Sequence, residues 1–456
     1  MFLPKTSHGV VPGRPGPLQE GCAGLVGLLM LGALVLTACL LAAGWISPAM
    51  APDSGTYINA SVVRSPMYVW FLAAMRGLFG EHFAEAVVLF QVTFGVGVAA
   101  YVGLRLQLLL GVSRMHGWMV FLVLFLPVLN PVHQIGLHVL SEGLAYPLFL
   151  MAACLMLDAL LTGSLRAFLY SLAVSALLIL VRKQFLFLWP AAFFALLGYC
   201  MLWRRGWRVF VMLCGALLLA SSLASLTERG WNYYRHGFWG GIPFTGMQLV
   251  AMPLFVSPLP VAPPPEGGAV AEFLSAASAA LSAQELTWSS IPVERRRDMY
   301  GEFFYSYNPS IFRVIWPLAE RILAPDRSDE VAVALAVDRG LVDAALHLIK
   351  AEPLAYLKMY LTNVATGLAG GLREGAFYLL LQLGLGGLAL LALFRQRVEA
   401  SPMGVAVLWA LLLHLGNVTA VAIVEPAMAR YTFYTHAWLV TILFLVIAPV
   451  VSRRSH

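Results

Sequence analysis

The sequence predicts an all-α, polytopic membrane protein of about ten transmembrane helices with one large, mostly helical extracytoplasmic segment. The first observation behind this prediction is composition: of 456 residues, 60% are hydrophobic and 11% are charged, which is unlike a soluble globular protein. The second is length, because several apolar runs approach the ~20 residues that a helix needs to cross a hydrocarbon core of about 30 Å.

The N-terminal part supplies a tail, a first span and a first outer loop. Residues 1–20 carry Lys5 and Arg14 and are rich in proline and glycine, and we expect a disordered cytoplasmic tail. The first span, Leu25–Ala42, runs outward and is expected to be retained, because further spans follow it. The first outer loop covers residues 46–82. Within it, Met67–Phe79 is apolar but interrupted by Arg76, so we expect a helix lying in the membrane interface.

The remaining spans are predicted in two modules, residues 21–227 and 375–456. The runs around 117–142 and 167–202 are short, and a re-entrant pair there would lower the span count without changing the orientation. The predicted ranges after the first span are Ala86–Leu104, Trp118 to about Asn130, Leu144–Met156, Ala167–Val181, Phe185–Leu202, Val209–Leu226, Ala376–Phe394, Met403–Val424 and Phe433–Val451.

Short basic links set the predicted orientation, because Lys and Arg concentrate on the cytoplasmic side of a membrane. With ten spans, the basic links and both termini are cytoplasmic, and residues 228–374 form one extracytoplasmic domain. Its helical patterns occupy 271–283, 292–323 and 331–366, the last restarted at Pro353. The net charge of +6 is explained by these links, so the expected surroundings are membrane lipids, with no nucleic-acid partner.

Ionisable residues on the predicted outer face are the candidates for chemistry. Asp53 lies where the chain first emerges outside, so it is either a solvated loop residue or cap, or a catalytic group. Arg182, Lys183 and Arg430 break the positive-inside pattern. Cations at the outer end of a helix either neutralise a phosphate at the bilayer surface or anchor the helix in the headgroups.

A second polar group raises the question of a metal. Glu81, His82 and Glu85 have a spacing that suits a divalent metal, and His133 is a further candidate ligand. The alternative is the wet N-terminus of a helix. We therefore expect no certain cofactor, with a divalent metal as the open alternative.

Four short motifs together resemble a known family. An acid and a tyrosine follow the first span, and Arg64-Ser65-Pro66-Met67-Tyr68 comes next. Ser141-Glu142 stands at a helix start, Arg182 follows the fifth span, and Glu425-Pro-Ala-Met-Ala-Arg430-Tyr431 precedes the last. Their order and placement resemble the GT-C glycosyltransferases, the membrane enzymes that use polyprenyl-phosphate sugars. That group includes the protein O-mannosyltransferases, of family 39, and the lipid A aminoarabinose transferase.

The resemblance implies a role for each matched residue. Asp53 would be the catalytic base and Glu142 the second acid, although many family members carry Asp-Glu at the first position and Asp at the second. Arg182 and Arg430 would hold the donor phosphate. The other substrate-binding candidates are Tyr57, Arg64, Tyr68, His133, Lys183 and Tyr431.

The function expected from these residues is transfer of a sugar from a polyprenyl-phosphate donor by single displacement, with an Asp general base. The acceptor is a lipid, glycan or protein on the outer face of a bacterial-type plasma (inner) membrane. No Asp-x-Asp or Gly-x-x-x-x-Gly-Lys motif indicates a soluble nucleotide donor or ATP-driven transport. The alternatives are a transporter or flippase of a lipid-linked saccharide, or a noncatalytic polysaccharide-assembly subunit. Clustering of polar residues at one face favours the enzyme.

Overall fold

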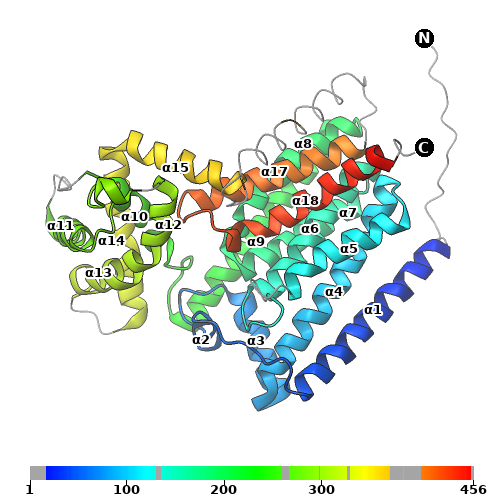
Figure 1. The fold of residues 1–456 in the computed structure, drawn as a ribbon, viewed down its shortest axis with the longest axis horizontal. Helices are drawn as coiled ribbons and strands as arrows, with labels where there is room; N and C mark the ends of the chain where they lie inside the picture. The colour runs from blue at the N-terminus through cyan, green and yellow to red at the C-terminus, as the bar shows by residue number, and fades with distance from the viewer. Residues whose placement is uncertain are drawn as a thin grey trace, which may run out of the picture.

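The structure, a computed structural model, describes residues 17–129, 135–258, 267–296, 298–325, 329–369, 384 and 402–452. These residues form helices and include no β-strand, which confirms the all-α prediction. They pack around two separate hydrophobic cores. Figure 1 shows long helices side by side around the first core and shorter helices gathered beside one end of them.

The first core belongs to a bundle of long apolar helices. In the described residues, six helical segments are long and apolar enough to cross a membrane, and α5 and α7 are shorter apolar helices. Of the predicted span Ala376–Phe394 the structure describes residue 384 alone, so the count of ten stays a prediction. The bundle contains α1 (Pro17–Ala42), α4 (Phe83–Leu110), α5 (Arg114–Leu129), α6 (Glu142–Thr162), α7 (Leu165–Val181), α8 (Leu188–Leu202), α9 (Trp207–His236), α17 (Pro402–Ala422) and α18 (Ala429–Ser452).

Helix α6 is anchored at the end that lies away from Glu142. It stops at Gly163, whose φ of +69° favours glycine. A Cβ at Gly163 would lie 2.7 Å from the Trp203 ring, and the Trp203 indole donates to the Leu160 carbonyl at 2.9 Å. At the same end, Arg105 of α4 forms a two-pronged ion pair with Asp158 of α6, with N–O distances of 2.7–3.0 Å. These contacts fix the axial position of α6 and hence of its first residue.

The second core is built by helices between residues 245 and 368. They are α10 (Thr245–Val256), α11 (Gly268–Ala283), α12 (Met299–Pro309), the π-helical η4 (Ser310–Ile315), α13 (Trp316–Leu323), α14 (Glu330–Ala351) and α15 (Pro353–Leu368). All three predicted helical patterns are present, and Pro353 occupies the first turn of α15 as expected. Asp298 and Asp329 cap α12 and α14 by accepting backbone N–H groups.

The two cores are joined at one end of the bundle. Helix α9 continues to His236, beyond the end of the predicted span at Leu226. Asn363 of α15 donates to the carbonyls of Ala422 and Glu425 and accepts from the Ala427 amide at 2.7 Å. This side chain therefore holds the connection between α17 and α18 against the second core.

Two short helices lie at the same junction. α2 (Ser54–Ile58) and α3 (Pro66–Phe79) both belong to the predicted first outer loop. Pro66 occupies the first turn of α3, and the helix buries Tyr68, Val69 and Leu72. Figure 1 shows α2 and α3 at the end of the bundle nearest the shorter helices.

Candidate active site at the junction of the two cores

The predicted first outer loop, residues 46–82, is fixed to the segment that leads into α6. Ala49 and His138 form an isolated parallel bridge, with backbone hydrogen bonds of 3.0 Å on both sides. The buried Ser54 hydroxyl donates to the Val139 carbonyl at 2.8 Å and accepts from the Ala51 amide. The loop therefore places α2 directly beside the start of α6, although the two are more than eighty residues apart in sequence.

Tyr57 and Tyr68 support this arrangement from within the core. The Tyr57 hydroxyl is hydrogen-bonded to Ser141 Oγ at 3.0 Å. The Tyr57 and Tyr68 rings meet edge to face with centroids 5.1 Å apart, and the Tyr68 hydroxyl donates to Gln91 at 3.3 Å. Both tyrosines are buried. The sequence predicts that Tyr57 and Tyr68 bind substrate. In the structure both lie in the core, behind the charged side chains at the surface of this junction.

Asp53 projects from the start of α2 toward two arginines. Its Oδ1 accepts from Arg64 Nη2 at 2.8 Å, and its Oδ2 lies 3.5 Å from Arg430 Nη2. Arg64 is itself held by Thr56 Oγ1 at 2.7 Å and lies over the Tyr57 ring. The Asp53 side chain is 40% exposed and makes no capping bond to α2. It is therefore a positioned carboxylate, and the cap interpretation does not describe it.

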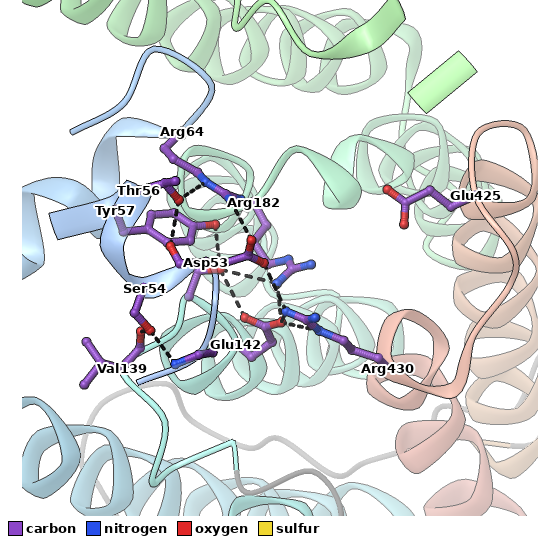
Figure 2. Close-up of polar contacts among 12 residues, drawn as sticks. Asp53, Ser54, Thr56, Tyr57, Arg64, Val139, Glu142, Arg182, Glu425 and Arg430 are labelled. Carbon is purple, nitrogen blue, oxygen red and sulfur yellow. Dashed lines mark hydrogen bonds and ion pairs between the residues drawn. The ribbon is translucent and has the colours of Figure 1, made fainter. Parts of the chain in front are cut away.

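Glu142, the first residue of α6, lies between two guanidinium groups. Its Oε1 is 2.7 Å from Arg182 Nη1 and accepts from Arg430 Nε and Nη2 at 2.9 and 2.7 Å. Ser141 Oγ approaches its other oxygen at 3.3 Å. Figure 2 shows Arg182, Glu142, Arg430 and Asp53 converging from four different segments of the chain. The side chain of Glu142 is 6% exposed, so this carboxylate holds the two arginines and has little contact with solvent.

The cluster carries one excess positive charge, because the guanidinium groups of Arg64, Arg182 and Arg430 face the carboxylates of Asp53 and Glu142. Arg430 is 45% exposed, whereas Arg182 is 14% exposed. A ligand that approaches the cluster therefore meets Asp53 and Arg430 first. Excess positive charge on fixed guanidinium groups is suited to a phosphate.

Tyr431 lies beneath the guanidinium groups of both Arg182 and Arg430. Its ring centroid is 5.9 Å from the guanidinium carbons of Arg182 and Arg430. Its backbone carbonyl accepts from Gln184 at 2.6 Å and Asn417 at 2.9 Å. These contacts fix the start of α18 and thereby the direction of Arg430.

Lys183 is directed to a different place from its neighbour Arg182. Its ammonium is paired with Glu228 of α9, whose other oxygen accepts from the Ile242 amide at 3.1 Å. Glu228 is buried. Lys183 thus joins α9 to the segment between α7 and α8, and its predicted role at the donor phosphate stays a prediction.

Three of the four residues considered for a metal, Glu81, His82 and Glu85, lie within the described part of the chain. Glu81 and His82 form the exposed turn η1, and Glu85 lies in the first turn of α4. His133 lies outside the described residues. Within the part of the chain that the structure describes, no group of three or more His, Cys, Asp or Glu side chains is arranged to hold a metal ion.

Glu425 is a further acid at the junction. It belongs to the motif that ends at Arg430-Tyr431, but the sequence predicts no role for it. It is 8% exposed and accepts from Gln248 of α10 at 2.6 Å. Burial raises the pKa of Glu425, and the nearby charges of Arg182 and Arg430 oppose that rise. Figure 2 shows its carboxyl pointing toward the cluster from the opposite side. The sequence signal for Glu425 is an acid five residues before Arg430, at the end of an apolar run.

Comparison with known proteins adds no family assignment: no protein-family model, curated protein or solved structure matches the chain. The resemblance to GT-C enzymes therefore stays an expectation from short motifs. The geometry of the cluster supports the functional proposal.

Proposed function

We propose that the protein is a membrane glycosyltransferase that moves a sugar from a polyprenyl-phosphate donor to an extracytoplasmic acceptor. The observation that carries the proposal is the approach of two half-exposed groups, the Asp53 carboxylate and the Arg430 guanidinium, to within 3.5 Å. A base and a phosphate-binding cation at one place are the groups that a single displacement at a phosphate-linked sugar requires.

In the proposed reaction each polar group has one task. Asp53 Oδ1 is held by Arg64, which leaves Oδ2 to take the proton from the acceptor hydroxyl. The acceptor oxygen forms a bond to the sugar carbon as the bond from that carbon to the phosphate oxygen breaks. The phosphate leaves with the electron pair, and Arg430 and Arg182 stabilise its charge. Because a lipid phosphate is already acidic, no general acid is needed.

The distribution of charged groups favours an enzyme over a carrier. A transporter is expected to place ionisable groups near the midplane. The Asp53 cluster lies at one end of the bundle and the Arg105–Asp158 pair at the other. Between α17 and α18, His414 and Asn417 both bond to Thr435, and these contacts involve no carboxylate, lysine or arginine. The ten-span topology, the outer location of residues 228–374 and the bacterial inner membrane belong to this proposal.

The decisive experiment replaces Asp53 with Asn and measures turnover of purified protein on a panel of radiolabelled polyprenyl-phosphate sugars. Asn keeps the size and can still contact Arg64, but it cannot accept the proton. We expect turnover to fall at least ~10²-fold, equivalent to about 2.7 kcal/mol of barrier, with the melting temperature and donor binding retained.

A matched control is Asp298→Asn. Asp298 caps α12, accepting from the Gly301 amide at 2.7 Å, and Asn caps a helix about as well as Asp. Turnover of this control should equal wild type. Near-normal turnover of Asp53→Asn would refute the mechanism. Movement of intact donor across a vesicle membrane without sugar transfer would instead support the transporter.

A further inference from the structure

A cavity of about 530 Å³ lies beside α2 and is separate from the Glu142 contacts. Pro52, Gly55, Thr56 and Asn59 line it, and their spacing places them on one face of this helical turn. Ser54 and Tyr57, which bind the start of α6, are on another face. The volume is within the ~300–1,000 Å³ range of small-molecule sites.

The opposite wall of the cavity comes from two other elements. Arg235 and His236 end α9, and Glu330 and Val331 begin α14. The cavity therefore opens where the first outer loop, the last turn of a bundle helix and the second core meet.

The polar side chains that line the cavity are available to a ligand. Asn59, Arg235, His236 and Glu330 make no side-chain hydrogen bond or ion pair with any residue that the structure describes. His236 Nε2 in particular is buried and has no such partner among those residues. Because this nitrogen is itself covered by protein atoms, the side chains that present polar atoms to a ligand in the cavity are Asn59, Arg235 and Glu330.

The chemistry of the lining favours a neutral, hydroxyl-rich ligand. Arg235 and Glu330 balance each other in formal charge, so neither an anion nor a cation is favoured. Pro52, Ala60, Val62 and Val331 also line the cavity, so its wall is part polar and part apolar. Such a wall suits the hydroxyl edges and C–H faces of a sugar better than an acyl chain, which would leave the polar groups unpaired. The amide of Asn59 and the hydroxyl of Ser61 can both donate and accept, as the hydroxyls of a sugar do. The Thr56 hydroxyl already donates to the Asp53 carbonyl and accepts from Arg64.

We propose that this cavity binds a neutral oligosaccharide, which is the acceptor of the sugar transfer; the acceptor role rests on the proposed function. Thr56 connects the cavity to the base. Its Oγ1 accepts from Arg64 Nε at 2.7 Å, and Arg64 Nη2 holds Asp53 Oδ1 at 2.8 Å. An oligosaccharide in the cavity would therefore lie next to the residues that position the Asp53 carboxylate.

The test fills the cavity without disturbing its walls. A Cβ built on Gly55 meets no atom within 4 Å, so Gly55→Phe places a ring in the open space of the cavity. Gly77→Phe is the matched control, because Gly77 is also helical, its Cβ also meets nothing within 4 Å, and it does not line the cavity. Equal melting temperatures for both variants establish that they fold.

Detergent-purified protein is applied to a glycan array that carries neutral, acidic and amino oligosaccharides. We expect wild type and Gly77→Phe to bind neutral oligosaccharides and Gly55→Phe to bind them at least ~10-fold more weakly. If Gly55→Phe fails to fold, Glu330→Gln replaces it, with an expected loss of about 10-fold or more for one charged hydrogen bond. Preference for charged glycans, no binding by wild type, or full binding by the variant overturns the inference.

A second measurement separates this inference from the proposed function. Radiolabelled donor is incubated with and without a neutral oligosaccharide that the array identifies. We expect Gly55→Phe to keep cleavage of the donor by water and to lose transfer to the oligosaccharide. If the protein binds oligosaccharides on the array but turns over no donor, the cavity is a saccharide-binding site and the proposed glycosyltransferase activity is refuted. Normal donor cleavage with transfer that Gly55→Phe does not reduce would refute the acceptor site alone.

Discussion

At the scale of single residues, Glu142 shows how a buried acid is tolerated. Removing a carboxylate from water is costly unless charged partners surround it. Arg182 and Arg430 supply those partners, at 2.7 Å each from the same oxygen. Glu142 thereby also keeps two cations close together, which is the arrangement that a phosphate-binding site needs. The ion pairs of Glu142 with Arg182 and Arg430 therefore stabilise the fold and, in the proposed function, also position the two cations for the phosphate.

We therefore expect Glu142→Gln to destabilise the fold as well as reduce turnover. The change leaves two neighbouring guanidinium groups without their shared anion, and breaking a buried pair costs ~3–5 kcal/mol. We expect the lower end of that range, because Arg430 is 45% exposed. Thermal denaturation in detergent measures this, with Asp53→Asn, an exposed carboxylate, as the comparison. Equal melting temperatures for the two variants would show that Glu142 is not what holds the arginines.

Arg430 and Lys183 are expected to respond differently to replacement by alanine. Loss of a charged hydrogen bond from Arg430 should weaken donor binding by about 10- to 150-fold. Lys183→Ala should instead lower the melting temperature and leave donor affinity close to wild type, because its ammonium is paired with buried Glu228. Binding of a labelled polyprenyl-phosphate sugar to both variants tests this. An equal loss of donor affinity in both variants would instead show that Lys183 contacts the donor phosphate.

At the scale of elements, the second core depends on close approach of α10 to α14. A Cβ at Gly246 would lie 2.2 Å from the Asp338 carbonyl oxygen, and the Gly246 amide donates to Asp338 Oδ1 at 2.6 Å. Burial raises the pKa of Asp338, and the backbone hydrogen bond from Gly246 opposes that rise. The glycine thus allows both the packing and the hydrogen bond.

Gly246→Ala should destabilise the protein, because the methyl group collides with a backbone atom that cannot move alone. Overpacking of this kind costs roughly 1–3 kcal/mol. Gly230→Ala in α9 is the matched control: its Cβ meets nothing within 4 Å, and alanine in a helix is favoured by about 0.5–1 kcal/mol. The two melting temperatures should therefore move in opposite directions. A drop in both, or in neither, would contradict the packing of α10 on α14.

At the scale of the whole molecule, the proposed site draws on both cores. Three segments meet at one end of the bundle: the loop that carries Asp53, the connection between α17 and α18 that carries Glu425, and the start of α14. Residues Asp53 and Arg430 are in contact, so they lie on the same side of any membrane that the bundle crosses. The side itself is set by the basic links in the proposed topology.

Labelling of single cysteines with a membrane-impermeant maleimide, in a cysteine-free background, tests that topology. Met50→Cys and Ser275→Cys, both exposed, should react from outside intact cells. Ser455→Cys, near the C-terminus, should react only after permeabilisation. Reaction of Ser455→Cys in intact cells would place the C-terminus outside and overturn the ten-span arrangement.

The sequence by itself determined the helical class and most helix positions. Apolar runs and helix starts depend on neighbouring residues, so the restart at Pro353 and the helices at 271–283 and 331–366 were predictable. The candidate acids and arginines were also predictable in kind, because charged residues at the end of an apolar run are few.

Only the tertiary structure decided which of these residues meet. Glu142 and Arg430 are 288 residues apart and share two hydrogen bonds, whereas the adjacent Arg182 and Lys183 point to different acids. The partner of Glu425 and the cavity beside α2 likewise depend on the second core. Side-chain direction and helix packing set such contacts, and neither is encoded in the local pattern of apolar and charged residues.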